Sequence, residues 1–190
     1  MPPANRILTS HVGSLIRPPE LLGLLERKRD GTPIDDAAIE TAKAKAVRDV
    51  VRHQAEIGID IVNDGEFGKN LSWSRYILER LDGFEPRPAQ RGDVFARATF
   101  GKDRRDFADF YAEYDPTQNM AGISNWAVTG PIAYKGQAAL AADLARFKAA
   151  LHGVGIADAF YPAVAPSSVA IDRKDEYYKS DEDYVVALGE

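Results

Sequence analysis

The segment Ile59-Asp60-Ile61-Val62-Asn63-Asp64-Gly65-Glu66 decides the fold class, because a short apolar run passes directly into a polar turn that contains glycine. A helical pattern precedes this predicted strand, and Gly58 is well placed to end that helix. Its apolar stripe has spacings of three and four and consists of Ile39, Ala42, Ala46, Val50, His53 and Ile57. The unit is therefore a helix followed by a strand that ends in a loop of polar residues.

The same alternation extends outward in both directions. Further strands are predicted at Ile7–Thr9, Trp126–Val128 and Phe160–Val164. Helices are predicted from Pro18-Pro19, after Thr32 or Asp35 as the capping residue, over 72–81, over 107–114, over 140–151, and after Ser180. From Pro86 to Arg105 the periodicity is lost, which indicates a surface excursion. Strands that alternate with helices favour right-handed βαβ units and a parallel sheet.

Four strands are half the number in a closed barrel of the TIM type, which takes roughly 250 residues. We therefore expect an α/β fold over residues 1–190 that forms the first four βα units of a parallel (β/α) barrel. This half-barrel is one domain and is incomplete at its C-terminus.

Composition excludes several classes of protein. The 190 residues carry a net charge of −5 with no basic stripe, so no nucleic-acid partner is expected. No apolar run approaches the ~20 residues that span a bilayer, and the N-terminus lacks a secretory pattern, so the expected location is cytoplasmic. The chain has no cysteine, which excludes disulfides and thiolate metal ligands.

The loops after the predicted strands carry the candidate site, since barrel chemistry lies at the carboxyl ends of the strands. Glu66 is the strongest candidate, because a carboxylate next to a strand end can reach a substrate ammonium group. The alternatives are an ordinary charge at the N-terminus of a helix and a salt bridge between Glu66 and Lys69. Gly13 and Ser14 can present backbone N–H groups to a substrate carboxylate, or they form an ordinary turn.

The histidines and aromatic residues are weaker candidates. His11 lies in the first loop and is either an acid, base or ligand, or a hydrogen-bonded structural group. His53 is expected in the core, and His152 at a helix end; the three do not have a metal-binding spacing. The aromatic residues Trp73 and Tyr76 are expected to be core residues.

Four segments together resemble a known family, the cobalamin-independent methionine synthases, and they occur in the family's order. They are His11-Val12-Gly13-Ser14-Leu15 with Arg17-Pro18, then 60–66, then Val128-Thr129-Gly130-Pro131, then 160–168 followed by Glu176-Tyr177-Tyr178 and Ser180-Asp181-Glu182. The resemblance implies a barrel that binds homocysteine, activates its thiol on zinc, and accepts a methyl group from 5-methyltetrahydrofolate. It implies that Gly13 and Ser14 hold the carboxylate of the amino acid and that Glu66 holds its ammonium group.

The sequence departs from the family in two places. The family's zinc ligands are a histidine, two cysteines and a glutamate from the second half of the barrel, and this chain offers no equivalent metal ligands. The family's folate-stacking tryptophan follows the Thr-Gly-Pro motif, but the nearest position here is Gln137, with Tyr134 close by.

The expected function is thus that of a thiol methyltransferase of methionine biosynthesis, if a second half completes it. The alternatives are a related barrel that alkylates another thiol, as the epoxyalkane–coenzyme M transferases do, or a non-catalytic half-barrel for binding or assembly. The expected partners are a small amino-acid thiol and either a second copy of the chain or a chain that supplies the second half.

Overall fold

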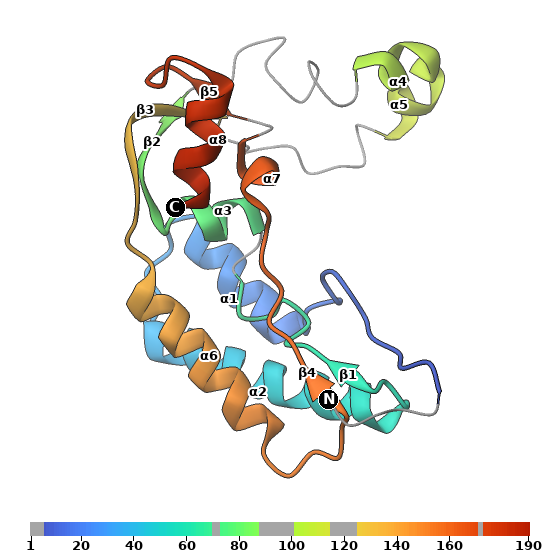
Figure 1. Ribbon diagram of the computed structural model, residues 1–190. Helices are drawn as coiled ribbons and strands as arrows, with labels where there is room; N and C mark the ends of the chain where they lie inside the picture. Colours follow the sequence, from blue (N-terminus) through green and yellow to red (C-terminus); the bar gives the residue numbers. More distant parts are fainter. Residues whose placement is uncertain (1–5, 70–72, 88–100, 115–124, 171–172) are drawn as a thin grey trace. The chain divides into compact units, whose positions relative to one another are not determined.

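The computed structural model describes residues 6–69, 73–87, 101–114, 125–170 and 173–190, which form two compact units (Figure 1). Unit 1 consists of Met1–Tyr76 and Gly136–Ala163, and unit 2 of Ile77–Lys135 and Val164–Glu190. Each unit therefore combines two segments that are distant in the sequence.

The helices of the described residues are α1 (Pro19–Arg29), α2 (Asp36–Glu56), α3 (Trp73–Leu78), α4 (Gly101–Asp106), α5 (Ala108–Tyr114), α6 (Gln137–Leu151), α7 (Pro166–Ala170) and α8 (Asp181–Gly189). The strands are β1 (Ile61–Val62), β2 (Leu81–Arg87), β3 (Asn125–Tyr134), β4 (Asp158–Ala159) and β5 (Lys174–Asp175). None of these helices is both long enough and apolar enough to cross a membrane.

Unit 1 is built from helices packed around a small parallel sheet. Helix α2 lies alongside both α1 and α6 (Figure 1). β1 pairs in parallel with β4, and Ser10 adds a parallel bridge to Ile61. The core joins the buried faces of α1, α2 and α6 to β1, and its members are Leu21, Leu25, Ile39, Ala42, Ala46, Val47, Val50, Val51, Val62, Phe67, Phe147 and Ala150.

Local sequence signals define both ends of α2 as predicted. The Asp35 side chain caps the first turn by accepting from the Ala37 N–H at 3.0 Å. At the other end, Gly58 adopts a φ of 89°, its N–H donates to the Ala55 carbonyl (3.1 Å), and the Ile59 N–H donates to Gln54 (2.9 Å). This pair of bonds is a Schellman motif, which directs the chain from the helix into β1.

Unit 2 is a mixed sheet covered by short helices. β2 and β3 are antiparallel, and β5 adds to β3 in parallel. The ladder is interrupted between Asp82 and Phe84, where Gly83 faces Gly130 and Pro131 of a bulge. α7 and α8 pack together, and the unit's core includes Phe84, Val128, Val169 and Tyr184.

The α/β class is confirmed, but the structure does not show the predicted row of four parallel strands. Trp126–Val128 lies within β3, whose antiparallel partner β2 begins at Leu81, a residue that the sequence analysis had placed in a helix. Residues 88–100 of the predicted excursion lie outside the described residues. Pairing between strands so far apart leaves no local periodicity, and this accounts for the wrong prediction.

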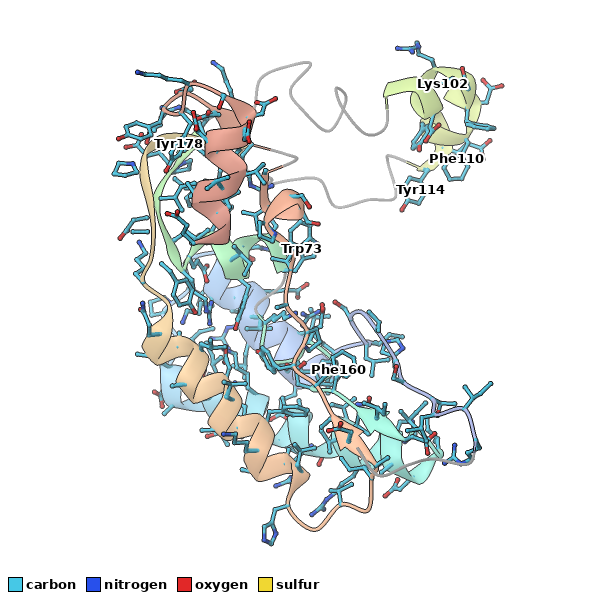
Figure 2. The ribbon with its side chains drawn as sticks, viewed as in Figure 1. Trp73, Lys102, Phe110, Tyr114, Phe160 and Tyr178 are labelled. Atoms are coloured by element: carbon cyan, nitrogen blue, oxygen red, sulfur yellow. The ribbon has the colours of Figure 1, made fainter. Side chains whose placement is uncertain are left out.

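Three further predictions about the core were wrong. His53 and Ile57 are exposed, whereas Gln54 is buried, because the buried stripe of α2 advances through Lys43, Val47 and Val51. Trp73 is 39% exposed at the start of α3 (Figure 2), whereas Tyr76 is buried as expected.

Candidate functional site

The loop after β1 is shaped by its own side chains. Asn63 Oδ1 accepts from the Gly65 N–H (2.7 Å), and Asp64 Oδ1 accepts from the Glu66 N–H (3.0 Å). Buried Gln54 fixes the start of the loop, since its amide both donates to the Asn63 carbonyl (2.8 Å) and accepts from the Asn63 N–H (3.2 Å). The loop is therefore attached rigidly to α2.

The first and second loops meet beside this turn. The Asn63 side-chain amide donates to the His11 carbonyl (2.5 Å), and the Leu15 N–H donates to the Gly65 carbonyl (3.1 Å). These bonds place Ser14 against Glu66, and the Ser14 hydroxyl donates to Glu66 Oε2 at 2.5 Å. The loops after two adjacent parallel segments thus present one carboxylate together with one glycine-serine turn.

Glu66 has an unusual backbone conformation. Its φ is 61°, and among the described residues it is the sole non-glycine residue with a positive φ. This region costs an ordinary L-residue about 1–2 kcal/mol, so surrounding bonds must maintain it. Arg17 supplies two of them, because its Nη2 donates to the carbonyls of Glu66 and Lys69, both at 3.1 Å.

The pKa values of two neighbouring carboxyls, Glu66 and Asp64, are shifted in opposite directions. Burial opposes ionisation of Glu66, but the hydrogen bonds from Ser14 and Lys69 and the nearby cations outweigh it, so the Glu66 pKa is lowered. Burial raises the pKa of Asp64, and in the described part of the chain its Oδ2 is enclosed without a well-formed hydrogen bond. Glu66 is therefore the carboxylate that is held in its charged form.

Lys69 completes the site from its inner side. Its Nζ donates to Glu66 Oε1 at 3.1 Å, and the residue is only 4% exposed. The ammonium lies 6.0 Å from the ring centroid of Tyr76 and 5.9 Å from that of Tyr161, within the range of cation–π attraction. The salt bridge considered for Glu66 from the sequence is therefore present, and it coexists with the contact to Ser14.

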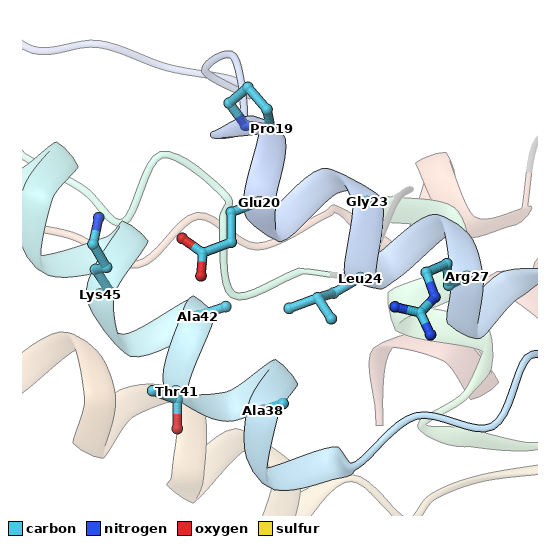
Figure 3. Close-up of a pocket in the computed structure, with 9 residues that line it drawn as sticks. All are labelled: Pro19, Glu20, Gly23, Leu24, Arg27, Ala38, Thr41, Ala42 and Lys45. Carbon is cyan, nitrogen blue, oxygen red and sulfur yellow. The ribbon is translucent and has the colours of Figure 1, made fainter.

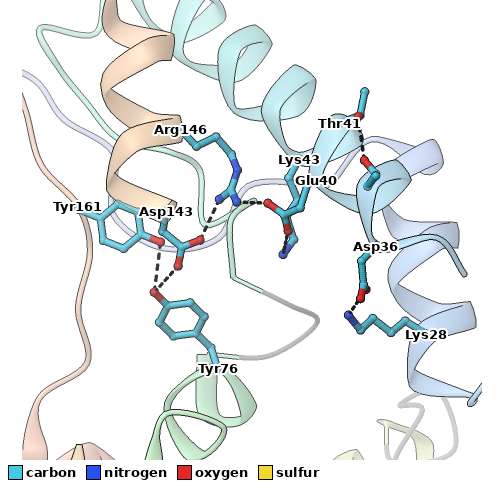
Figure 4. Close-up of polar contacts among 10 residues, drawn as sticks. Lys28, Asp36, Glu40, Thr41, Lys43, Tyr76, Asp143, Arg146 and Tyr161 are labelled. Carbon is cyan, nitrogen blue, oxygen red and sulfur yellow. Dashed lines mark hydrogen bonds and ion pairs between the residues drawn. The ribbon is translucent and has the colours of Figure 1, made fainter. Parts of the chain in front are cut away.

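A buried polar network holds the two tyrosines (Figure 4). The Tyr76 hydroxyl donates to Asp143 Oδ2 (2.7 Å) and lies 3.5 Å from the Tyr161 hydroxyl. Arg146 pairs with Asp143 (2.8 Å) and also with Glu40. Helices α2 and α6 thus fix the surroundings of Lys69.

His11 does not build a metal centre in this structure. Its Nε2 lies 3.1 Å from the Gly13 carbonyl, a distance at which the Nε2–H tautomer donates to its own turn. Among the described residues, no group of three or more histidine, aspartate or glutamate side chains is placed to hold a metal ion. These residues therefore do not fit the catalytic zinc site that the resemblance implies, which needs three protein ligands.

The structure brings together two of the four predicted loops. Gly13, Ser14 and Glu66 meet in unit 1, with His11 in the same turn. Thr129-Gly130-Pro131 lies instead within β3, and Pro166-Ser167-Ser168 opens α7, both in unit 2. Arg17 and Tyr161 support the site, but no local pattern in the sequence marks them for this role. The pairing of Glu66 with Lys69, in contrast, was indicated by their spacing of three residues.

A separate groove of unit 1 lies between α1 and α2 (Figure 3). Its volume is about 610 Å³, with Leu24 and Ala42 on its walls and Glu20, Arg27 and Lys45 around it. None of the predicted site residues lines it, so it is distinct from the Ser14–Glu66 site.

Comparisons with known proteins support a structural relationship. No protein-family model matches the sequence. The uncharacterised protein YxjH of Bacillus subtilis (strain 168) is 39% identical over 130 residues, which are 64% of this chain and 34% of that protein.

Two solved structures resemble nearly the whole chain. One is a B12-independent methionine synthase from Shewanella sp. W3-18-1, in complex with selenomethionine. The match covers 95% of this chain and 44% of the synthase chain, with a TM-score of 0.60 and 20% identity. A putative vitamin-B12 independent methionine synthase from Listeria monocytogenes matches 96% and 46% with a TM-score of 0.58 and 18% identity. The chain thus spans less than half the length of these proteins, and the likeness establishes a related fold.

Proposed function

We propose that unit 1 binds the amino-acid end of a thiol substrate for a methyl- or alkyl-transfer reaction related to methionine synthesis. The observation that carries this proposal is the 2.5 Å contact between Ser14 and Glu66, which joins the loops of two adjacent parallel segments. The fold that the chain shares with methionine synthases supports the same class of reaction.

The site offers a carboxylate for the ammonium group and backbone N–H donors for the carboxylate of a zwitterionic ligand. Glu66 is ionised, and each of its oxygens accepts one protein hydrogen bond, which leaves lone pairs for a substrate ammonium. Within the described residues, no acceptor binds the backbone N–H of Gly13 or Ser14, so both can donate to a substrate carboxylate. The strained backbone of Glu66 also favours a functional role, since a glycine at that position would avoid the strain.

The role of these residues is substrate binding. We further propose that groups outside the described residues activate the thiol. A second copy of the chain or a partner chain would supply these groups. Side chains near the site are consistent with such a partner, since Val12 and Ile16 flank the Gly13–Ser14 turn and are strongly exposed.

A binding or assembly module is the second candidate function. Such a module would need only the Ser14–Glu66 site, which the described residues contain. A transfer assay with any candidate partner chain separates the two functions, since only the enzyme yields a methylated or alkylated thiol.

The proposal is tested by calorimetry with two ligands that differ in one group. L-Homocysteine carries the ammonium, and 4-mercaptobutyrate is the same molecule without it. We expect Glu66→Gln to weaken L-homocysteine binding by about 1.5–3 kcal/mol, the scale of a lost charge-assisted hydrogen bond. The same substitution should hardly change the weaker binding of 4-mercaptobutyrate.

Glu20→Gln is the matched control, because Glu20 is an exposed glutamate of the same unit that lines the α1–α2 groove. It should bind both ligands as the unaltered chain does. Equal loss for the two ligands in Glu66→Gln, or no loss for either, would contradict the assignment of the ammonium to Glu66.

A further inference from the structure

Lys69 has a burial and a set of neighbours that a surface ion pair would not require. The residue is 4% exposed, and its ammonium contacts Glu66 at 3.1 Å between two tyrosine rings. A lysine is rarely buried to this degree without a specific partner, because removing an ammonium group from water is costly. Glu66 is that partner, and the rings of Tyr76 and Tyr161 add cation–π attraction.

The position of Lys69 is fixed from three directions. The Lys69 N–H donates to the Glu66 carbonyl (3.1 Å), and the Arg17 guanidinium donates to the Lys69 carbonyl (3.1 Å). Tyr76, whose ring lies next to the Lys69 ammonium, is held by its hydrogen bond to Asp143. The ammonium therefore has one well-defined location, on the inner side of the Glu66 carboxylate.

Ser14 approaches the same carboxylate through the other oxygen. Lys69 binds Oε1 and Ser14 binds Oε2, so together the two groups determine the plane in which the carboxylate lies. Without Lys69, the Glu66 side chain would keep the Ser14 bond but could rotate about it.

A second lysine of unit 1 shows what an ordinary pair of this kind looks like. Lys43 is also mostly buried and bonds Glu40 at the same distance, 3.1 Å, with the same separation of three residues. The Glu40 side chain, however, is 51% exposed and that of Glu66 is 12% exposed. Water can solvate Glu40 when its lysine is removed, but Glu66 depends far more on its protein partners.

We infer that Lys69 is a positioning residue, which fixes the Glu66 carboxylate from the interior so that its free lone pairs face an amino-acid ligand at the Gly13–Ser14 turn. This inference rests on the proposed function for the ligand, but not for the state of Glu66 itself. The charged groups that face Glu66 are Lys69, Arg17 and Asp64. Of these, Lys69 alone bonds the carboxylate through its side chain.

The test compares Lys69→Met with Lys43→Met. Methionine keeps an unbranched apolar chain of similar length and removes the charge, so Lys69→Met should fold. Carbon-13 NMR of the Glu66 carboxyl, assigned through Glu66→Gln, reports its titration without any ligand. We expect Lys69→Met to move the Glu66 midpoint upward and Lys43→Met to leave it unchanged. Lys69→Gln provides the same comparison with a polar side chain if the methionine variant is unstable.

Ligand binding gives an independent reading of the same variants. At pH 7, Lys69→Met should bind L-homocysteine about ten-fold more weakly, the loss expected when a hydrogen bond to a charged group no longer orients the carboxylate. Its affinity should also fall as the pH is lowered towards 4.5, a range in which the unaltered chain retains binding.

The outcomes test the role of Lys69 separately from the proposed amino-acid ligand. An unchanged Glu66 midpoint in Lys69→Met and Lys69→Gln would overturn the role of Lys69. A shifted midpoint with no L-homocysteine binding by any variant, the unaltered chain included, would support Lys69 as the group that positions Glu66 and would refute the proposed amino-acid ligand.

Discussion

Unit 1 and unit 2 differ in the kind of element on which each is built: long helices in unit 1 and an antiparallel strand ladder in unit 2. In unit 1, the longest elements are helices with local caps, and β1 follows α2 after a short Schellman turn. In unit 2, the main contact is the ladder between β2 and β3. The two residues of this ladder that lie closest in sequence, Arg87 and Asn125, are 38 positions apart. The candidate site lies in unit 1, and the loop that carries Glu66 follows a helix whose end is marked by local bonds, so this loop could be located from the sequence.

Gly83 and Gly58 provide the largest expected contrast between the units. Both have a positive φ, 85° and 89°, but an added Cβ at Gly83 would meet backbone oxygens of Gly130 and Pro131 at 2.7 Å, and at Gly58 nothing lies within 4 Å. We expect Gly83→Ala to destabilise unit 2 by about 3–5 kcal/mol, since backbone atoms must move as well as the residue being strained. Gly58→Ala should cost unit 1 about 1–2 kcal/mol from the strain alone.

Hydrogen exchange with mass spectrometry is the suitable measurement for this pair, because it reports on each unit separately. Loss of protection in unit 2 should be confined to residues 77–135 and 164–190. Equal costs for the two alanine variants would show that the Gly83–Pro131 contact does not determine the geometry of the sheet.

Val51 and Val128 give a smaller contrast with matched chemistry. Both side chains are 0% exposed, Val51 on α2 in unit 1 and Val128 on β3 in unit 2. Truncation to alanine leaves a cavity in either core, but alanine favours a helix and disfavours a strand. We expect Val128→Ala to cost about 2–4 kcal/mol and Val51→Ala about 1–2 kcal/mol, measured by denaturant unfolding.

The reverse order of these two costs would contradict the view that backbone preference separates the units. Trp126 is partly buried against the unit 2 core and Trp73 is exposed in unit 1, so fluorescence in a Trp73→Phe background follows unit 2. This probe assigns each unfolding transition to its unit.

Local bonds in both units explain much of what could be predicted from the sequence. Asp35, Gly58 and Ser180 act through bonds to residues within a few positions, and each was placed correctly at a helix end. The approach of Ser14 to Glu66 followed from two loops after adjacent parallel segments, a relation that the alternation of strands and helices implies.

The errors arise where the partner is distant or the period drifts. Val128-Thr129-Gly130-Pro131 has the composition of a strand followed by a turn, but its bulge is specified by contact with Gly83, 47 positions before Gly130. His53 was placed in the core by a spacing of three after Val50, whereas the buried face of α2 continues with a spacing of four, from Val50 to Gln54. The two rings beside Lys69 come from Tyr76 of α3 and from Tyr161 after β4, and no local pattern specifies that they meet.

The most direct test of the amino-acid site is an NMR titration of backbone amides with L-homocysteine. The site predicts that the largest shifts fall on residues 11–15 and 64–69, led by the N–H groups of Gly13 and Ser14, and that they are lost in Glu66→Gln. Unit 2 should change little. Shifts that are centred on unit 2 or on the α1–α2 groove, or that persist in Glu66→Gln, would contradict binding of an amino acid between Glu66 and the Gly13–Ser14 turn.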